Sequence, residues 1–440
     1  MSAPQETRTT DTLVIGGGIA GLQTALDLAE QGFEVTVVEK GPSVGGKMIS
    51  LSKVFPTLDC ASCITTPKMA AAAHHENITI LTLAEVESVE RRDDGFSVRV
   101  ELAPRYVDEE KCIGCRLCEY ACDSNVPDEF EDGLGGRRAI RVPFTNAIPQ
   151  IALLDPTECN LCGKCVKACP TDAVILDQTA RSIEIEAGAV VVATGYELTP
   201  IEAKREYRGE ELDNVISPLT MERLLAPHGP YGRVLRPSDG KIPDSIAFVQ
   251  CAGSRDASLG VPYCSRVCCM YAIKQAMLLA GAVPLADITI YYMDIRAFGK
   301  GYETFYRNAA AMGVEFVKGK VARISDAENG DVTVRFEHVD GLGQVEEKKH
   351  DLVVLSLGMV PAADLSDRLP IEVGSDGFVR VPKPLLEPGA TDEPGIFVTG
   401  TAAGPKDIVD AIAEAGSAAM AVTNHLRRRE PAACAVQAEN

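Results

Sequence analysis

Short apolar runs alternate with glycine-rich turns and amphipathic stretches along this 440-residue chain. Residues 12–15 form an apolar run, residues 22–31 an amphipathic stretch with helical spacing, and residues 34–38 a second apolar run. Further strands are expected at residues 78–82 and 96–102. Strands that alternate with helical segments favour a parallel sheet covered by helices. The pattern therefore predicts an α/β fold.

The turn between the first strand and the first helix is rich in glycine, and the second strand ends at an acidic residue. Glycines at this spacing permit a tight turn, close approach of the backbone to a pyrophosphate, and close packing of a helix whose N-terminus faces the phosphates. Glu39 can accept a hydrogen bond from a ribose hydroxyl. A glycine-rich turn without a ligand is the alternative, but the order of elements favours a dinucleotide site. The residues expected in it are Gly16, Gly18, Ala20, Gly21 and Glu39.

Three later segments resemble the FAD-binding fold of the disulfide-reductase and thioredoxin-reductase flavoproteins. They are a double glycine shortly after Glu39, an apolar strand and turn at residues 189–195, and a second such turn at residues 395–401, before a helix expected from about residue 408. Flavoproteins of this type usually carry Gly-Asp where this chain has Gly400-Thr401, and a threonine hydroxyl can still hydrogen-bond the ribityl chain. The resemblance adds to the FAD site Lys40, Gly45, Gly46, Lys47, Ala193, Thr194, Gly195, Gly400, Thr401, Lys406, Asp407 and Ile408.

Two cysteine runs with the spacing C-x2-C-x2-C-x3-C lie between residues 104 and 185. This is the bacterial ferredoxin spacing, in which the fourth cysteine of each run ligates the cluster of the other run. One [4Fe-4S] cluster is therefore expected on Cys112, Cys115, Cys118 and Cys169, and the other on Cys159, Cys162, Cys165 and Cys122. Zinc is the alternative by ligand type, but eight cysteines without a histidine at this spacing disfavour it.

A further cysteine group follows the apolar strand expected at residues 245–250. It comprises Cys251, Cys264, Cys268 and Cys269, with Lys274 shortly after the last of them. In a flavoprotein with two Rossmann domains this turn would be a glycine-rich cradle for a pyrophosphate. Thiols here indicate that an iron–sulfur site replaces a nucleotide site, and buried structural thiols are the alternative.

Cys60 and Cys63 form an isolated C-x-x-C pair. Such a pair is compatible with a redox dithiol, with half of a metal site that needs ligands from elsewhere, or with two ordinary buried thiols. The sequence leaves these three interpretations open.

Composition excludes some classes of partner and location. The chain has 43 Lys and Arg against 63 Asp and Glu, for a net charge of −20, which disfavours binding to nucleic acid. Residues 1–10 lack an apolar signal core, and no apolar run is long enough to span a membrane. The chain has fifteen cysteines, and in a reducing cytoplasm those at these spacings indicate metal ligands rather than disulfides. A cytoplasmic location is expected, or one at the membrane periphery through a complex.

Together these patterns predict an α/β flavoprotein with two Rossmann-like domains, similar to thioredoxin reductase, and an inserted α+β ferredoxin domain of the bacterial 2[4Fe-4S] type. The FAD-binding domain is expected to be discontinuous, at residues 1–103, 186–225 and 353–440. The ferredoxin-like insert is expected at residues 104–185, and the second Rossmann-like domain, with its C-x12-C-x3-C-C site, at residues 226–352. Residues 218–239 are expected to form a loop-rich connector.

Several motifs resemble those of the heterodisulfide reductase A subunits over nearly the whole chain. They are Asp59-Cys-Ala-Ser-Cys63, the two ferredoxin runs, Cys251-Ala-Gly-Ser-Arg-Asp256, Tyr263-Cys-Ser-Arg-Val-Cys-Cys269 with Lys274, and Gly404-Pro-Lys-Asp-Ile408. The resemblance implies a third [4Fe-4S] cluster on the Cys251 group near the flavin. It also implies that Lys274 lies at the reactive edge of the isoalloxazine, as the candidate catalytic residue. The flavoprotein A subunits of the quinone-interacting membrane-bound oxidoreductases are close relatives and the alternative family.

The resemblance implies an oxidoreductase component, acting on a sulfur group, that passes electrons between FAD and three [4Fe-4S] clusters, with flavin-based bifurcation as a further expectation. The implied partners are B- and C-like subunits or other electron-transfer subunits, a ferredoxin, and a hydrogenase or dehydrogenase, in an oligomer. The A subunits of methanogens are longer, and this chain lacks the cysteine-rich motif of the disulfide-reducing subunit, so it is not expected to reduce a disulfide alone. Two other classes remain open, a stand-alone NAD(P)H-dependent disulfide reductase that uses Cys60 and Cys63, and a scaffold with degenerate cofactor sites.

Overall fold

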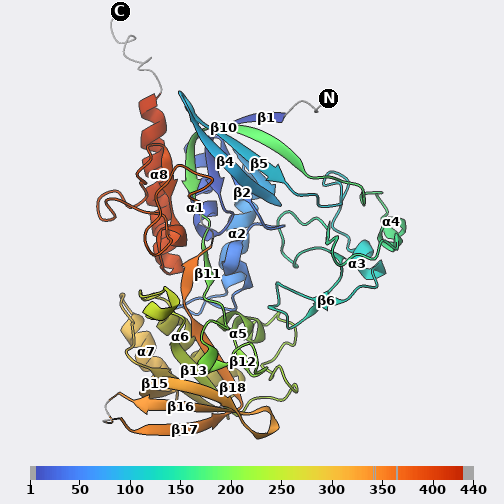
Figure 1. The fold of residues 1–440 in the computed structure, drawn as a ribbon. Helices are drawn as coiled ribbons and strands as arrows, with labels where there is room; N and C mark the ends of the chain where they lie inside the picture. The colour runs from blue at the N-terminus through green and yellow to red at the C-terminus, as the bar shows by residue number, and fades with distance from the viewer. Residues whose placement is uncertain (1–5, 340, 342, 363–364, 430–440) are drawn as a thin grey trace, which may run out of the picture.

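Two seven-stranded sheets form the framework of the computed structural model, which describes residues 6–339, 341, 343–362 and 365–429 (Figure 1). The first sheet has the order β3-β2-β1-β10-β5-β4, with β20 paired to β10. Its strands are β1 (Glu6–Ile15), β2 (Val35–Glu39), β3 (Ile78–Thr82), β4 (Ala84–Arg92), β5 (Gly95–Leu102), β10 (Arg181–Val192) and β20 (Ile396–Val398).

Strand β1 is longer than its apolar run because it pairs in parallel with β10 along its whole length, from Glu6 opposite Ile183 to Ile15 opposite Val192. The strand expected at residues 78–82 is confirmed, and the helix expected from residue 22 begins at Ile19. Strand β4 escaped sequence analysis because its alternating residues are largely polar. It lies at the edge of the sheet, where β5, antiparallel to it, is its one partner among the described strands.

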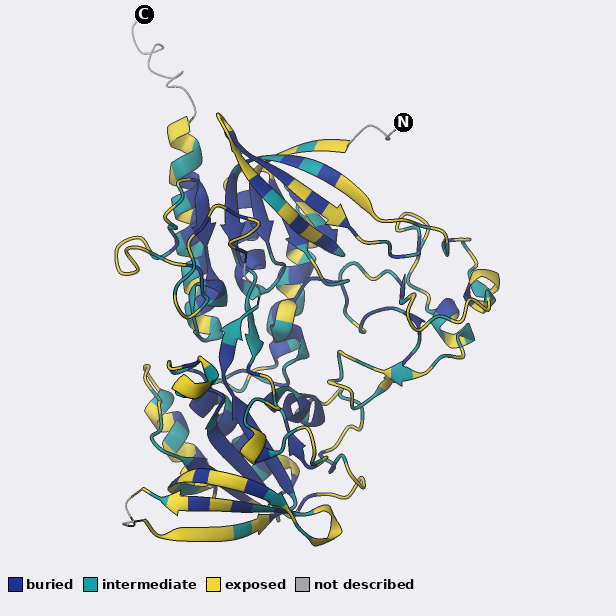
Figure 2. Cartoon of the chain, viewed as in Figure 1, coloured by how far each residue is buried: buried dark blue, intermediate teal, exposed yellow. Residues whose placement is uncertain are grey.

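We call the first sheet with its helices the first unit, and the second sheet with its helices the second unit. Three described α-helices belong to the first unit, and Figure 2 shows a buried layer between them and the sheet. They are α1 (Ile19–Ala29), α2 (Ala61–His74) and α8 (Ile408–Arg429). Leu22 and Leu28 of α1 pack with Val37 of β2 and Val422 of α8, all fully buried. The expectation of a helix from about residue 408 is confirmed. Packing of α1 against α8 brings residues far apart in the sequence to one face of the sheet.

The second sheet has the order β12-β18-β13-β14-β15-β16-β17. Its strands are β12 (Val215–Ile216), β13 (Ser245–Ala252), β14 (Asp287–Tyr292), β15 (Glu315–Asp326), β16 (Val332–His338), β17 (Val345–His350) and β18 (Leu352–Leu357). Its helices are α5 (Pro218–Leu225), α6 (Cys268–Ala282) and α7 (Tyr302–Ala311). The short strands β11 (Tyr196–Leu198) and β19 (Met359–Pro361) pair where the chain crosses between the two units.

Helix α5 corrects one expectation, because it lies within residues 218–239, where the sequence predicts a loop-rich connector. Ser217 caps the helix by accepting a hydrogen bond from the Thr220 backbone N–H at 3.0 Å, and Pro218 occupies the first helical position. Both features are recognised start signals for a helix. The sequence thus contained the signal, which the neighbouring prolines and glycines obscured.

The segment between β5 and β10 forms a separate small unit that projects from the side of the first sheet (Figure 1). It contains α3 (Leu117–Ala121), α4 (Lys164–Ala168) and two short hairpins, β6–β7 (Val126–Pro127, Gly136–Arg137) and β8–β9 (Ile140–Arg141, Leu153–Leu154). Ile140, Val142 and Leu154 form its core together with Cys118 and Cys165. We call this unit the insert.

The strands cross two of the expected domain limits. Strand β10 runs through the limit between residues 185 and 186. Strand β18, expected in the FAD-binding domain from residue 353 onward, pairs with β13 in the second sheet, as β12 does with β18. We therefore propose the same three parts with the insert ending before Arg181 and the second unit extending from Val215 to Leu357.

Among the helices that the structure describes, none combines the length and apolar character needed to cross a bilayer.

Packing around the glycine turn generates a stability prediction. A Cβ atom on Gly21 would lie 1.9 Å from the Gly16 carbonyl oxygen, whereas a Cβ atom on Gly281 of α6 would meet no atom within 4 Å. We expect Gly21→Ala to lower the free energy of unfolding by about 1–3 kcal/mol through overpacking. Gly281→Ala should leave the free energy of unfolding unchanged or raise it by up to about 1 kcal/mol. Thermal unfolding followed by circular dichroism compares the two, and equal midpoints would contradict the packing argument.

Candidate functional site

A cavity of about 290 Å³ lies between the two sheet units. The first unit contributes the turn after β1, the end of β2, the segment around residues 46–55, and the start of α8. The second unit contributes α5 and α6. The predicted residues that line the cavity are Gly16, Gly18, Ala20, Glu39, Lys40, Gly46, Lys47, Ala193, Thr194, Gly195, Thr401, Lys406, Asp407, Ile408 and Lys274.

The other three predicted residues, Gly21, Gly45 and Gly400, lie behind the cavity wall and shape it. Gly45 has a φ of +121° and Gly400 a φ of +64°. A Cβ atom added to Gly400 would lie only 2.6 Å from the Cβ of Ala20, which is too close. At such φ values a side chain is strained. These glycines therefore set the backbone path around the cavity.

The glycine turn fits a bound pyrophosphate. A Cβ atom on Gly46 would lie 2.8 Å from the Gly18 Cα, so two backbone segments meet here without side chains between them. Gly18 is the N-cap residue of the 11-residue helix α1, and its N-terminus has no side-chain cap among the described residues. The first N–H groups of a helix lack intrahelical partners and favour an anion. The turn therefore presents backbone N–H groups without intrahelical partners to the cavity.

Glu39 is fixed by two backbone donors. The Gly17 N–H donates to Glu39 Oε2 at 2.8 Å, and the Gly41 N–H donates to Oε1 at 2.7 Å. Each carboxylate oxygen has a second lone pair. The Glu39 side chain can therefore hold this turn and still accept a ribose hydroxyl.

Lys274 is buried at the cavity wall, with 2% of its surface exposed. Its Nζ donates to Glu222 Oε1 and, at 2.9 Å, to the Lys53 carbonyl oxygen. Glu222 also accepts from the Ser52 N–H at 3.0 Å, from the Ser52 hydroxyl at 2.6 Å and from Gln275 Nε2 at 2.6 Å. Among the described residues, the hydrogen-bond donors to the Glu222 carboxylate thus come from the segment before α2 and from α6.

The environment shifts both charges of this pair. Burial lowers the pKa of Lys274, and the Glu222 carboxylate offsets only part of this effect. Burial raises the pKa of Glu222, but Lys274 and the hydrogen bonds from Ser52 and Gln275 outweigh it, so this pKa lies below its usual value. Glu222 is therefore an anion. Sequence analysis missed it, because one acid on an unrecognised helix carries no motif.

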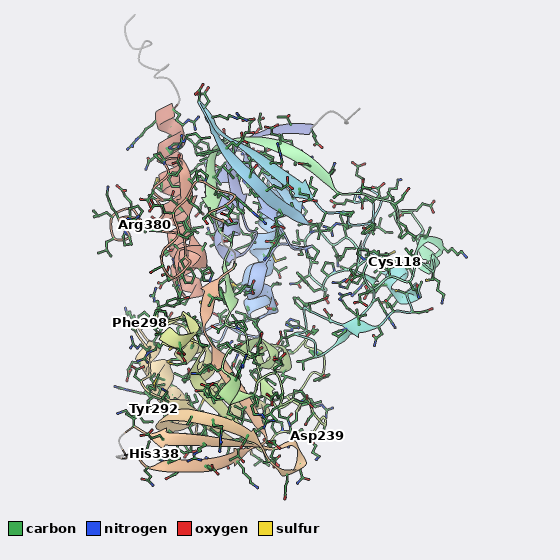
Figure 3. The ribbon with its side chains drawn as sticks, in the orientation of Figure 1. Cys118, Asp239, Tyr292, Phe298, His338 and Arg380 are labelled. Carbon is green, nitrogen blue, oxygen red and sulfur yellow. The ribbon has the colours of Figure 1, made fainter. Side chains whose placement is uncertain are left out.

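The eight ferredoxin-type cysteines surround two hollows of about 20 Å³ each in the insert. Cys112, Cys115, Cys118 and Cys169 line one hollow, and Cys122, Cys159, Cys162 and Cys165 line the other. The structure thus brings together the two groups that the ferredoxin spacing predicts, including the exchange of each fourth cysteine. Figure 3 shows Cys118 in the insert, on the side of the molecule opposite Phe298.

The local backbone suits thiolate ligands. The Ala173 N–H donates to Cys169 Sγ at 3.2 Å, and the Leu161 N–H to Cys159 Sγ at 3.4 Å. Burial, together with the neighbouring thiols, raises the pKa of Cys118 to about 12. A bound iron cluster would favour the thiolates, since metal ligands must be deprotonated. Within the described ranges, no three His, Cys, Asp or Glu side chains are placed to hold a single metal ion.

The cysteine group of the second unit also gathers in one place. Cys251 is the residue before the last of strand β13 and has a φ of +59°, and Cys268 and Cys269 begin α6. Burial raises the pKa of Cys268, and the nearby thiols of Cys269, Cys251 and Cys264 raise it further. The four thiols are therefore close enough to act on one another. Helix α6 carries two of them at its start and Lys274 further along.

Cys60 and Cys63 lie at the start of α2, outside the residues that line the large cavity. Cys60 Sγ accepts a hydrogen bond from the Cys63 N–H at 3.3 Å, and Cys63 is exposed. The side-chain hydrogen bond to Cys60 raises the pKa of Cys63. The three interpretations of this pair stay open.

Comparison with known families and structures identifies the fold and the insert. The family described as FAD dependent oxidoreductase matches residues 11–48, and the 4Fe-4S dicluster domain matches residues 111–173. A thioredoxin reductase from Lactococcus lactis superposes with a TM-score of 0.55 and 14% identity, over 95% of this chain and 99% of that one. The chain thus has a thioredoxin reductase-like FAD flavoprotein fold with a 4Fe-4S dicluster domain as its insert.

Two relatives match nearly the whole chain. The iron-sulfur A subunit of CoB–CoM heterodisulfide reductase from Methanocaldococcus jannaschii is 47% identical over 93% of this chain and 63% of its own length. The A subunit of the H2:CoB-CoM heterodisulfide,ferredoxin reductase from Methanothermobacter marburgensis is 45% identical over 92% of this chain and 62% of its own. The chain spans less than two thirds of the length of these relatives.

The buried ion pair generates a second prediction. Replacing Lys274 by Met leaves the Glu222 carboxylate buried without a counter-charge, which costs about 3–5 kcal/mol. The loss shrinks as the pH falls, because an unpaired buried carboxyl has a raised pKa and becomes neutral below it. We expect the double variant Lys274→Met/Glu222→Gln to recover most of the stability. Denaturant unfolding at several pH values measures each free energy of unfolding.

The exposed pair of Lys383 with Glu387, at 3.6 Å, provides the control. Lys383→Met should change the free energy of unfolding by less than about 1 kcal/mol. A Lys274→Met protein as stable as the parent at neutral pH would contradict the buried pair.

Proposed function

We propose that the chain belongs to the family of heterodisulfide reductase A subunits and that it is an electron-transfer subunit of a heterodisulfide reductase-like complex. It carries FAD in the cavity between its two units and two [4Fe-4S] clusters in the insert. The observation that carries the proposal is the placement of α6, which joins the four-cysteine group to the wall of the FAD cavity.

The Cys251, Cys264, Cys268 and Cys269 group holds a third [4Fe-4S] cluster in this proposal. Gln250 supports it, because this side chain is 7% exposed and neither polar atom of its amide has a hydrogen-bond partner among the described residues. Gln250 and Cys251 line the same hollow, of about 180 Å³. A buried amide without a partner is costly, and the sulfur atoms of a cluster are acceptors for such a donor.

Lys274 is the residue proposed to act on the flavin. When bound, FAD exchanges two electrons with one-electron carriers, and a nearby cation favours negative charge on the reduced ring. Lys274 meets this requirement through its place at the cavity wall and its ion pair with Glu222. Glu222, in turn, keeps the ammonium group in position. The glycine turn and Glu39 hold the pyrophosphate and the ribose in this proposal.

The proposed partners are B- and C-like subunits, with a ferredoxin and a hydrogenase or dehydrogenase as donor or acceptor, in a cytoplasmic oligomer. The Methanothermobacter marburgensis relative is named for hydrogen and ferredoxin, which supports redox couples of this kind. Bifurcation of electrons at the flavin is part of the proposal, as is action on a disulfide substrate through a disulfide-reducing partner.

An anaerobic native pull-down with the tagged chain tests the proposed complex. We expect a cysteine-rich, disulfide-reducing subunit to be recovered with it, and reduction of that complex to bleach the flavin. Recovery of a membrane haem subunit would instead assign the chain to the quinone-interacting complex. Bleaching of the isolated chain by NAD(P)H alone would show a stand-alone reductase and refute the proposal.

The cluster content gives a further prediction. Three [4Fe-4S] clusters predict about twelve irons per FAD in the anaerobically reconstituted chain. Cys268→Ser should reduce this to about eight, because it removes a ligand of one cluster. Cys63→Ser, outside the three proposed cluster sites, serves as the control and should leave the ratio unchanged. Iron and flavin assays measure both, and a Cys268→Ser protein with the parental iron content would disprove the third cluster.

A further inference from the structure

Helix α5 lies between the insert and α6, where it contacts both (Figure 1). Two consecutive residues of α5 make ion pairs on its two sides. Glu222 faces the FAD cavity and binds Lys274, whereas Arg223 faces the insert and binds Glu131. The insert and the flavin site are therefore connected through adjacent side chains on one short helix.

Arg223 is the contact on the insert side, and only 1% of its surface is exposed. Its Nε and Nη2 donate to the two carboxylate oxygens of Glu131 at 2.9 and 3.0 Å. Its guanidinium carbon lies 4.7 Å from the centre of the Phe130 ring. A paired, stacked guanidinium of this kind has little freedom to reorient. The insert thus fixes the position of Arg223.

The segment before α2 is held by the same two residues of α5. Arg223 Nη1 donates to the Ser50 carbonyl oxygen at 2.9 Å. Glu222 accepts from both the N–H and the hydroxyl of Ser52. This segment continues to Lys53, whose carbonyl oxygen accepts from Lys274. A displacement of Arg223 therefore reaches Lys274 by two routes, through Glu222 and through residues 50–53.

The insert also contacts the start of α5. Asp132 accepts hydrogen bonds from the Ser217 hydroxyl, at 2.9 Å, and from the Thr220 hydroxyl. Ser217 is the residue that caps the helix. The insert thus contacts both the cap of α5 and a residue of its last turn, in addition to the packing of α5 against α6.

We propose that Arg223 is a positioning residue that couples docking of the insert to the Lys274–Glu222 pair. With the insert docked, Glu131 and Phe130 hold Arg223, and α5 presents Glu222 to Lys274. When the insert leaves, the buried guanidinium loses its counter-charge, a cost that forces it toward water and displaces α5. The proposal rests on the proposed role of Lys274 beside FAD. Coupling of this kind is reciprocal, so a change at the pair also alters docking.

The test changes the insert and measures the flavin. Glu131→Gln lies on the insert, outside the FAD cavity, and removes the charge that holds Arg223. We expect it to shift the flavin midpoint potential of the reconstituted full-length chain in the same direction as Glu222→Gln does. Hydrogen–deuterium exchange of the backbone amides of residues 218–225 should rise in the same variant. An unchanged potential with Glu131→Gln, when Glu222→Gln shifts it, would overturn the proposal.

Two controls separate coupling from simpler effects. Glu129→Gln is the same substitution two residues away, on a side chain that pairs with Arg137 and Arg141 inside the insert, so it controls for loss of one charge. Asn146→Ala removes the 2.6 Å hydrogen bond to Thr66 of α2 and leaves the Glu131–Arg223 pair intact, so it controls for loss of an insert contact away from α5. Neither should shift the potential as Glu131→Gln does. An equal shift in either control would overturn the coupling through α5.

A double-mutant cycle separates failure of the coupling through Arg223 from failure of the proposed role of Lys274 beside FAD. If Arg223 acts through the Lys274–Glu222 pair, Glu131→Gln should have little further effect on the potential once Lys274→Met/Glu222→Gln is present, since coupled sites are not additive. Additive shifts would mean independent effects and would overturn the proposal. If neither Glu222→Gln nor the Lys274→Met/Glu222→Gln double variant shifts the potential, the role of Lys274 in the proposed function fails instead.

Discussion

The buried ion pair of Lys274 with Glu222 is the interaction on which the junction of the molecule depends. Two opposite charges lie out of water, and each is satisfied only if its remaining hydrogen bonds are made. Those bonds come from Ser52 and the Lys53 carbonyl of the first unit and from Gln275 of the second. The pair therefore fixes how the two units face one another across the cavity proposed to hold FAD. A hydrophobic contact of similar size would tolerate sliding, whereas this network does not.

Helix α6 fixes the position of Lys274 relative to two of the cysteines. Cys268 and Cys269 begin the helix, and Lys274 follows on the same rigid element. A helix holds its side chains at fixed separations. The distance from Cys268 and Cys269 to the cavity wall is therefore a property of one helix and does not depend on a loop. Helix α5 packs against α6 and completes the wall with Glu222.

Sequence analysis predicted the parts of the site that rest on local backbone rules and missed those that rest on tertiary packing. The glycine turn at Gly16, the acid at Glu39 and both ferredoxin groupings follow from spacing within a few residues or from a known exchange of ligands. Lys274 was found only through family resemblance, because a lone helical lysine is usually exposed. Glu222 and Arg223 were not found, since their roles depend on which neighbours of α5 are buried, and no local pattern encodes that.

The two Rossmann-like units show why one holds a nucleotide and the other thiols. In the first unit only residues 16–18 separate β1 from α1, so the helix N-terminus lies directly beyond the strand and faces a phosphate. In the second unit residues 253–267 separate β13 from α6. Cys251, Arg255 and Arg266 adopt positive φ values around this long turn, a conformation that non-glycine residues adopt at a cost. Strain of this kind persists only where the surrounding structure enforces it. The longer turn folds back on itself and brings Cys264 to Cys251. At this place the second unit therefore has a group of thiols, where the first unit has the backbone N–H groups of a short glycine turn.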